Sequence, residues 1–321
     1  TFEDSTPDFP QGVKAPDGAP NVLLILLDDV GFAQVGSFGA LIETPNIDRL
    51  AKSGLRYTNF HTTALCSPSR AALLTGRNPH SVNMGGITEM ATSAPGYTSV
   101  LPKDKAPLAM TLKLNGYSTA QFGKCHEVPV WQTSPMGPFD NWPTSSGFEH
   151  FYGFIGGETN QFHPFLYENT TAIETPKTNA DGSEFHLSQG MADQAIKWLD
   201  NWKGLRDAPF FIYYTPGAVH APIQVPKEWR DKYKGKFDEG WHAYRAQLLE
   251  RQKKLGLVPE DAKMVDWPEV LPKWDSFSKE GKAYLARQME INAAFLGVGL
   301  QETLTIGRRQ YVFSTPQLGP F

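Results

Sequence analysis

The chain has 321 residues, of which 40% are hydrophobic and 20% are charged, and its formal net charge is -4. This balance is typical of a globular protein, excludes disordered and collagen-like chains, and gives no reason to expect a nucleic-acid partner. No run of about 18 apolar residues predicts a membrane span, and the first residues do not form a basic and then apolar leader. The two cysteines are too few for a disulfide framework and favour a reducing or redox-indifferent location.

The N-terminal part of the chain divides into an arm and a first strand. Residues 1–20 contain four prolines and little apolar periodicity, which predicts an extended arm over the surface. Residues 22–27 are continuously apolar and predict a parallel strand with helices on both faces. This strand ends at Asp28 and Asp29, so two carboxylates stand at its carboxyl end. Further along, we expect a helix over 45–52 and a strand over 56–60.

A cysteine stands at the start of the next expected helix. Ser67 is a preferred N-cap, Pro68 suits the first helical position, and Gly76 can adopt the left-handed conformation that closes the last turn. Cys66 would then lie just before the unpaired amides of the helix N-terminus, where an anion or thiolate is favoured. Arg70 adds a guanidinium that suits a tetrahedral oxyanion.

Strands and helices alternate through the rest of the chain. We expect helices over 108–114, 187–202, 241–255 and 279–295, strands over 117–122 and 209–214, and long pocket-walling loops over 127–183. The alternation predicts an α/β fold with a mostly parallel sheet and helices on both faces. Lys124, His126 and His220 follow the carboxyl ends of expected strands, as Asp28 and Asp29 do, and open α/β sheets bind ligands at that edge.

Each of these residues has an ordinary interpretation when it is taken alone. Cys66 could be a buried structural cysteine, and one aspartate could cap a turn while the other is solvated. His220 could be a core histidine bonded to the backbone. The paired aspartates also suit a hard cation such as Ca²⁺ or Mg²⁺, which takes carboxylate oxygens. A phosphatase that attacks with cysteine is excluded, because it needs arginine six positions on and Ala72 stands there.

Two stretches resemble a known enzyme family. Residues 66–70 read Cys-Ser-Pro-Ser-Arg and 74–77 read Leu-Thr-Gly-Arg, which resembles the signature of type I sulfatases, whose cysteine is oxidised to formylglycine. Residues 123–129, Gly-Lys-Cys-His-Glu-Val-Pro, are similar to bacterial arylsulfatases in particular. The resemblance covers about residues 21–296. It implies the alkaline-phosphatase-like sulfatase fold and hydrolysis of sulfate esters.

The resemblance also implies roles for individual residues. Asp28, Asp29 and the modified Cys66 would hold a divalent cation, Ca²⁺ or Mg²⁺. Arg70 would hold the aldehyde hydrate, Lys124 would bind the sulfate, and His126 and His220 would act as base and acid. The implied partners are a small sulfate ester and, during maturation, a formylglycine-generating enzyme, in a bacterial-like cytoplasm or periplasm.

The family pattern breaks near the C-terminus. Sulfatases of this kind have a second acidic pair and a further lysine, but no Asp follows Asp275, no Asn follows Asn292 and no Lys follows Lys282. We therefore expect an arm over 1–20, an incomplete catalytic domain over 21–296, and an aberrant tail over 297–321, with the C-terminal part missing and a weak metal site. A phosphonate or phosphate monoester hydrolase and a catalytically silent remnant are the alternative functions.

Overall fold

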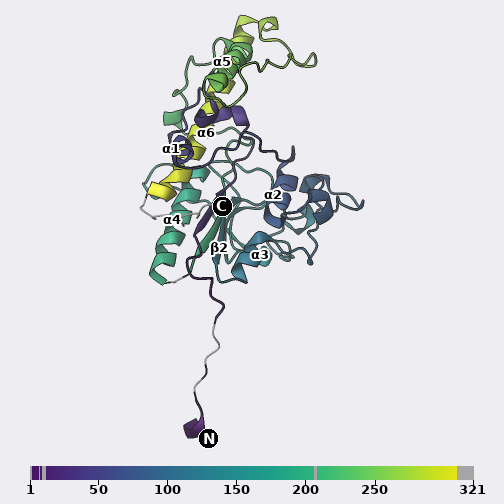
Figure 1. Cartoon of the computed structure of the whole chain (residues 1–321), viewed down its shortest axis with the longest axis vertical. Coiled ribbons are helices and arrows are strands. Elements are labelled where there is room, and N and C mark those ends of the chain that lie inside the picture. The colour runs from purple at the N-terminus through teal and green to yellow at the C-terminus, as the bar shows by residue number, and fades with distance from the viewer. Residues whose placement is uncertain (1, 7, 9–11, 206–207, 309–321) are drawn as a thin grey trace.

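The computed structural model describes residues 2–6, 8, 12–205 and 208–308, and its centre is a six-stranded sheet. The strands run in the order β1-β6-β2-β3-β4-β5 (Figure 1). Their bounds are β1 (Val22–Ile25), β2 (Ser118–Lys124), β3 (His150–Phe154), β4 (Leu166–Glu168), β5 (Thr171–Ile173) and β6 (Phe210–Thr215). The four strands β1, β6, β2 and β3 pair in parallel, whereas β4 and β5 continue the sheet antiparallel. The predicted mostly parallel α/β sheet is confirmed.

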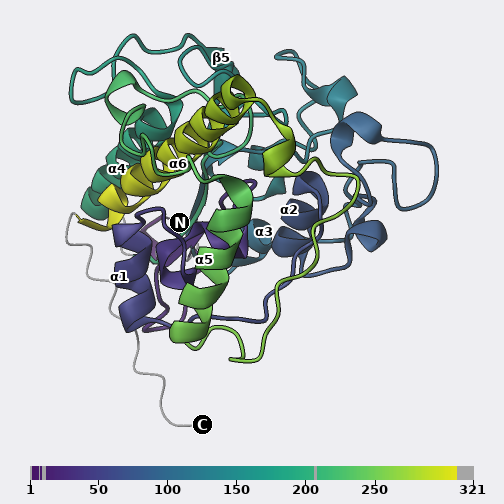
Figure 2. The ribbon, with the colours of Figure 1, turned by 90° about the horizontal axis from the view of Figure 1, so that it is seen from above.

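Helices cover both faces of this sheet, as the apolar strands predicted. They are α1 (Pro45–Ser53), α2 (Cys66–Thr75), α3 (Leu108–Lys113), α4 (Leu187–Leu205), α5 (Gly240–Lys254) and α6 (Lys279–Arg308). Helix α4 packs on one face, and α2 and α3 lie on the other (Figure 1). Helices α1, α5 and α6 pack together beside the sheet (Figure 2).

Strand β6 shows how the sequence divides its side chains between the two faces. Successive side chains of a strand point to opposite faces. Phe210, Ile212 and Tyr214 pack in the core under α4, whereas Phe211 and Tyr213 pack in the core under α2 and α3. Both faces are therefore buried, which explains why the strand is apolar at every position instead of alternating.

The expected elements differ from the observed ones in two places. The strand predicted over 56–60 is wrong: this segment is exposed and forms no strand, because the alternation of its residues has no sheet partner. Residues 127–183, predicted as loops, contain β3, β4 and β5. These strands are short, and β3 is stabilised by pairing with β2, a contact that local patterning does not reveal.

Helix α6 forms the C-terminal end of the described chain, and the arm forms its N-terminal end. Helix α6 continues across position 296, where the family-like pattern stops, and its residues 293–298 pack in a second core with Val219 and Phe237. The predicted aberrant tail falls partly on residues 309–321, which lie outside the described part. In the N-terminal arm, Lys14 and Ala15 lie against Gly116, whose φ is +84°. Among the described helices, none is long and apolar enough to cross a membrane.

Candidate functional site

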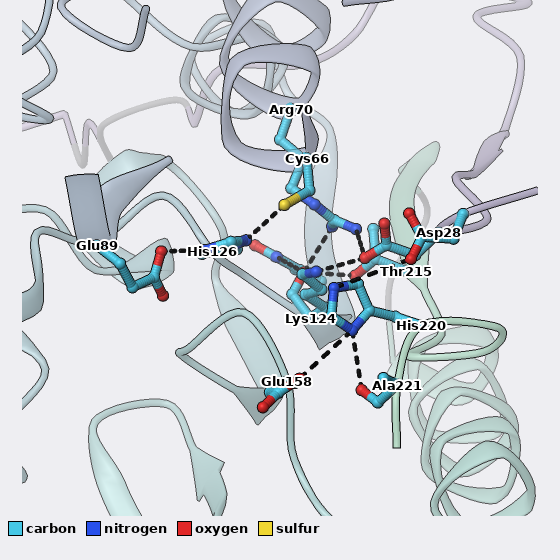
Figure 3. Close-up of polar contacts among 12 residues, drawn as sticks. Asp28, Cys66, Arg70, Glu89, Lys124, His126, Glu158, Thr215, His220 and Ala221 are labelled. Atoms are coloured by element: carbon cyan, nitrogen blue, oxygen red, sulfur yellow. Dashed lines mark hydrogen bonds and ion pairs between the residues drawn. The ribbon is translucent and has the colours of Figure 1, made fainter. Parts of the chain in front are cut away.

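The carboxyl ends of β1, β2 and β6 bring the predicted site residues to one edge of the sheet (Figure 3). The loop after β1 carries Asp28, the end of β2 carries Lys124, and the loop after β6 carries His220. The backbone N–H of Val219 donates to the carbonyl of Asp28 at 2.9 Å, so the loops after β1 and β6 are held together. These strands become neighbours only in the folded sheet. Residues that are far apart in the sequence therefore come to lie side by side.

Helix α2 presents Cys66 to this edge. The helix begins at Cys66 with Leu65 as its N-cap, so the expectation that Ser67 is the N-cap is wrong. Ser67 is instead buried inside the first turn. The expected closing residue is correct: Gly76 has φ +64° and its N–H donates to the carbonyl of Ala72. Cys66 is therefore the first residue of the helix, at the end where backbone amides lack partners within the helix.

A buried group of three charges lies below Cys66. The Oδ2 atom of Asp28 is 3.1 Å from Nη2 of Arg70 and 2.5 Å from Nζ of Lys124. Nη1 of Arg70 also donates to the carbonyl of Lys124 at 3.0 Å. The side chains are 6%, 1% and 0% exposed, respectively. Burial by itself would raise the pKa of Asp28, but the charges of Arg70 and Lys124 hold it below its ordinary value. The group is thus ionised, with one anion between two cations.

A second group links Cys66 to a histidine and a glutamate. The Sγ atom of Cys66 is 3.0 Å from Nδ1 of His126, and Nε2 of the same ring is 2.8 Å from Oε2 of Glu89. Burial lowers the pKa of His126 to about 4, although the hydrogen bond to Glu89 acts in the opposite direction. Burial raises the pKa of Glu89, but its hydrogen bond with His126 leaves that pKa below the ordinary value. At neutral pH a neutral imidazole therefore lies between a thiol and a carboxylate.

His220 lies on the more open side of the site. Its Nδ1 is 2.8 Å from the carbonyl of Ala221, which acts as the acceptor, so Nδ1 carries a proton. Nε2 is 4.0 Å from Oδ2 of Asp29, and Nδ1 is 3.8 Å from Oε2 of Glu158. The imidazole side chain is 25% exposed, whereas the two carboxylate side chains are mostly exposed. This histidine can therefore meet a molecule that enters from solvent.

The predicted cation ligands do not form a complete metal cage. Asp28 and Asp29 are adjacent, but the Oδ2 atom of Asp28 already contacts two cationic side chains. Across the described ranges, no three His, Cys, Asp or Glu side chains come together in a group that could hold a metal ion. A hard cation takes six to eight oxygen ligands. The carboxylates suit such an ion in their chemistry, but no group of three acidic, histidine or cysteine side chains forms around them in the described part of the chain.

Several polar residues of the site were not anticipated from the sequence. Glu89 contacts His126, Glu158 lies near His220, and Thr215 donates from Oγ1 to the carbonyl of Lys124 at 2.8 Å. Glu89 stands in a Gly- and Ser-rich stretch and Glu158 in a stretch rich in Gly and aromatic residues, and neither matches a motif. Only the terminal position of Thr215 in β6 is a usable signal, since the ends of parallel strands converge.

The described structure also contains cavities that are not lined by the predicted site residues. One of about 660 Å³ is lined by residues of α5 and α6 such as Trp241 and Tyr284, and none of the predicted site residues lines it. Another of about 190 Å³ is bordered by Cys125 and Glu127, which alternate with Lys124 and His126. Burial raises the pKa of Cys125 to about 12, so this thiol stays protonated and unreactive.

We predict that the buried carboxyl of Glu127 makes the stability of the folded protein depend on pH. Burial raises its pKa to about 7, against 4.5 ordinarily, with the charge of Arg70 acting in the opposite direction. The unfolded chain releases this proton near pH 4.5 and the folded chain near pH 7, so stability falls as pH rises between these values. We expect Glu127→Gln to raise the free energy of unfolding by up to about 3 kcal/mol at pH 8 and to leave it unchanged at pH 4.5.

Urea denaturation of both proteins at the two pH values checks this expectation. The difference between the two proteins at each pH removes the contributions that they share and reports the effect of Glu127. The exposed Glu260→Gln is the matched control and should change stability at neither pH. An equal difference between Glu127→Gln and the parent at both pH values would contradict the expected titration.

Known proteins are similar to this chain in sequence and in fold. The family model described as Sulfatase matches residues 20–286. An uncharacterized sulfatase of Schizosaccharomyces pombe is 34% identical over 302 residues, covering 88% of this chain and 53% of that protein. An arylsulfatase of Klebsiella aerogenes is 28% identical over 285 residues, covering 86% of this chain and 59% of the relative. The crystal structure of a putative sulfatase from Bacteroides fragilis matches with a TM-score of 0.66 at 20% identity, covering 94% of this chain and 62% of that one.

These matches extend over most of the chain. It spans between half and three-fifths of the length of these two curated relatives. The matched region contains α2 and all six strands, and therefore the whole edge at which the site residues meet. The chain belongs to the sulfatase family.

Proposed function

We propose that this protein hydrolyses sulfate esters at residue 66, after Cys66 has been converted to formylglycine. The observation that carries this proposal is the position of Cys66. Its Sγ lies at the first turn of α2, 3.0 Å from the neutral ring of His126 and on the side of the site where Arg70 and Lys124 meet Asp28 (Figure 3). A nucleophile, a base and two buried cations thus meet at one point. One hydroxyl of the hydrated aldehyde would attack sulfur as the bond from sulfur to the alcohol breaks, and the second hydroxyl would then lose its proton, re-form the aldehyde and release sulfate.

The surrounding side chains suit the proton transfers of this reaction. Nδ1 of His126 faces residue 66 and can accept a proton from a hydroxyl there. His220 holds a proton on Nδ1 against Ala221, and its Nε2 is turned toward Asp29, 4.0 Å away. When protonated, that nitrogen can donate to the leaving alcohol. Base and acid therefore stand on different elements, after β2 and after β6.

The buried charges of the site favour an anionic substrate. Arg70 and Lys124 contribute two positive charges and Asp28 cancels one of them, so this buried group keeps one positive charge beside residue 66. A sulfate ester is a monoanion and needs less neutralisation than a phosphate monoester, which is mainly a dianion at neutral pH. A phosphonate monoester is also a monoanion, so it is the competing substrate. Arg70 and Lys124, which are buried and shielded from water, would stabilise negative charge on the oxygens of either the sulfate or the phosphonate.

We also propose that Asp28 and Asp29 supply part of a Ca²⁺ or Mg²⁺ site. The support is their adjacency at the end of β1 and the preference of these ions for carboxylate oxygens. The modified residue 66 would add a further oxygen, and among the described residues no third His, Cys, Asp or Glu side chain joins the two aspartates in a metal-holding group.

One substrate series tests the proposed reaction. The protein is produced with a formylglycine-generating enzyme, supplied with Ca²⁺, and given one aryl group as sulfate, phosphonate and phosphate. We expect turnover of the sulfate to be highest and that of the phosphate to be lowest. Peptide mass spectrometry across residue 66 reports the conversion of Cys66. A preference for the phosphonate would replace the proposed substrate, and no hydrolysis by folded, converted protein would indicate a silent remnant.

A further inference from the structure

Glu89 holds one ring nitrogen of His126 and leaves the other facing residue 66. Oε2 of Glu89 is 2.8 Å from Nε2 of His126 and also accepts from the hydroxyl of Thr88 at 3.2 Å. An ionised carboxylate can only accept hydrogen bonds, so Nε2 must carry the ring proton. In a neutral imidazole the other nitrogen, Nδ1, then has a free lone pair. That lone pair points at Sγ of Cys66, 3.0 Å away.

The backbone on both sides keeps this ring in place. His126 has φ +56°, in the left-handed region, and its N–H donates to the carbonyl of Ile155 at 2.9 Å. Gly157 lies directly against the ring: a Cβ there would be 2.8 Å from Cε1 and 2.9 Å from Nε2 of His126, and 3.4 Å from Oε1 of Glu89. Only a residue without a side chain leaves room for the pair of His126 and Glu89. The pair is therefore packed in one orientation.

We propose that Glu89 is the positioning residue of His126, which holds the ring in the tautomer that presents Nδ1 as a proton acceptor to residue 66. This inference rests on the proposed function, in which Nδ1 takes a proton from a hydroxyl of residue 66. When Nδ1 takes that proton the ring becomes an imidazolium, and the carboxylate of Glu89 stabilises the new charge. Glu89 itself touches neither substrate nor nucleophile, because the ring of His126 lies between them (Figure 3).

Two variants at position 89 separate positioning from a structural role. Glu89→Ala removes the acceptor, and we expect kcat for the aryl sulfate to fall about 10²-fold with KM within about twofold. Glu89→Gln keeps an acceptor oxygen but not the charge, and it should restore part of kcat. A merely structural role would change KM as well as kcat and would not be rescued by Glu89→Gln.

Further variants supply the controls. The side chain of Glu89 is 45% exposed, so its removal should leave the fold intact, which near-ultraviolet circular dichroism checks. Gly157→Ala leaves Glu89 in place but presses a methyl group on the ring, and it should lower kcat in the same way. Glu43→Gln, on the surface beside Lys232, should leave kcat unchanged. An unchanged kcat in Glu89→Ala would overturn the proposal.

A measurement that needs no turnover separates this proposal from the proposed function. Nitrogen-15 NMR of the histidine rings, on the chain with unmodified Cys66, distinguishes a proton on Nε2 from one on Nδ1. We expect His126 to carry its proton on Nε2 in the parent chain and to become a mixture of tautomers in Glu89→Ala. A parent chain with the proton on Nδ1 would refute the positioning role. The expected tautomer without any hydrolysis would refute the proposed function alone.

Discussion

Cys66→Ala is expected to abolish sulfate ester turnover, by more than about 10⁴-fold, while the stability of the protein changes little. Alanine cannot be converted to formylglycine, so no nucleophile forms at the N-terminus of α2. The fold should tolerate the change because Cys66 is only half-buried and its thiol has one polar contact, with His126. Steady-state turnover of an aryl sulfate, with urea denaturation of the same samples, measures both effects.

The second cysteine provides a matched control for this prediction. Cys125 is buried against Val128, Trp142, Phe151 and Ile155 and contributes nothing to the proposed reaction. Cys125→Ala should therefore lower the free energy of unfolding by about 1 kcal/mol through lost packing, with turnover per folded molecule retained. Cys66→Ala should therefore lose turnover and keep its stability, whereas Cys125→Ala should lose stability and keep its turnover. Turnover that survives in Cys66→Ala would show that residue 66 is not the nucleophile.

Asp28→Asn is expected to lower the free energy of unfolding by about 3–5 kcal/mol. The change leaves Arg70 and Lys124 side by side in the interior, with side chains 1% and 0% exposed, without the anion that lies between them. Two like charges that have lost water and their counter-charge are costly, whereas asparagine supplies only a neutral acceptor. Urea denaturation near pH 7 measures the loss. Turnover should fall as well, because the positions of both cations change.

The pH dependence and an exposed ion pair test the cause of this loss. The pKa of Asp28 is lowered in the folded protein, so its stabilising effect is complete above its ordinary pKa of 3.8 and disappears as the pH falls through the folded value. Asp104→Asn breaks the surface pair with Lys105, 2.7 Å apart, and should have no measurable effect. If Asp28→Asn lowered the free energy of unfolding as little as Asp104→Asn does, the result would contradict a buried cluster of charges.

The sequence alone was enough to identify the elements whose signals are local. A continuous apolar run predicted β1, whose partly buried side chains pack alternately against the cores on the two faces of the sheet. Gly76 marked the end of α2, because a left-handed residue closes a helix with little strain. The Cys-Ser-Pro-Ser-Arg stretch pointed to the family. The placement of Asp28, Lys124 and His220 at strand ends followed from the geometry of parallel sheets.

The tertiary structure alone decided how these residues act together. Glu89 meets His126 across 37 positions of sequence, and Arg70 meets Asp28 across 42. The burial that keeps the ring of His126 neutral depends on the packing of whole elements and is not encoded in the residue type. Strand β3 likewise forms by pairing with β2. Local patterns report conformational preference, whereas ring tautomers, charge clusters and strand pairing depend on contacts between distant segments, which exist only after folding.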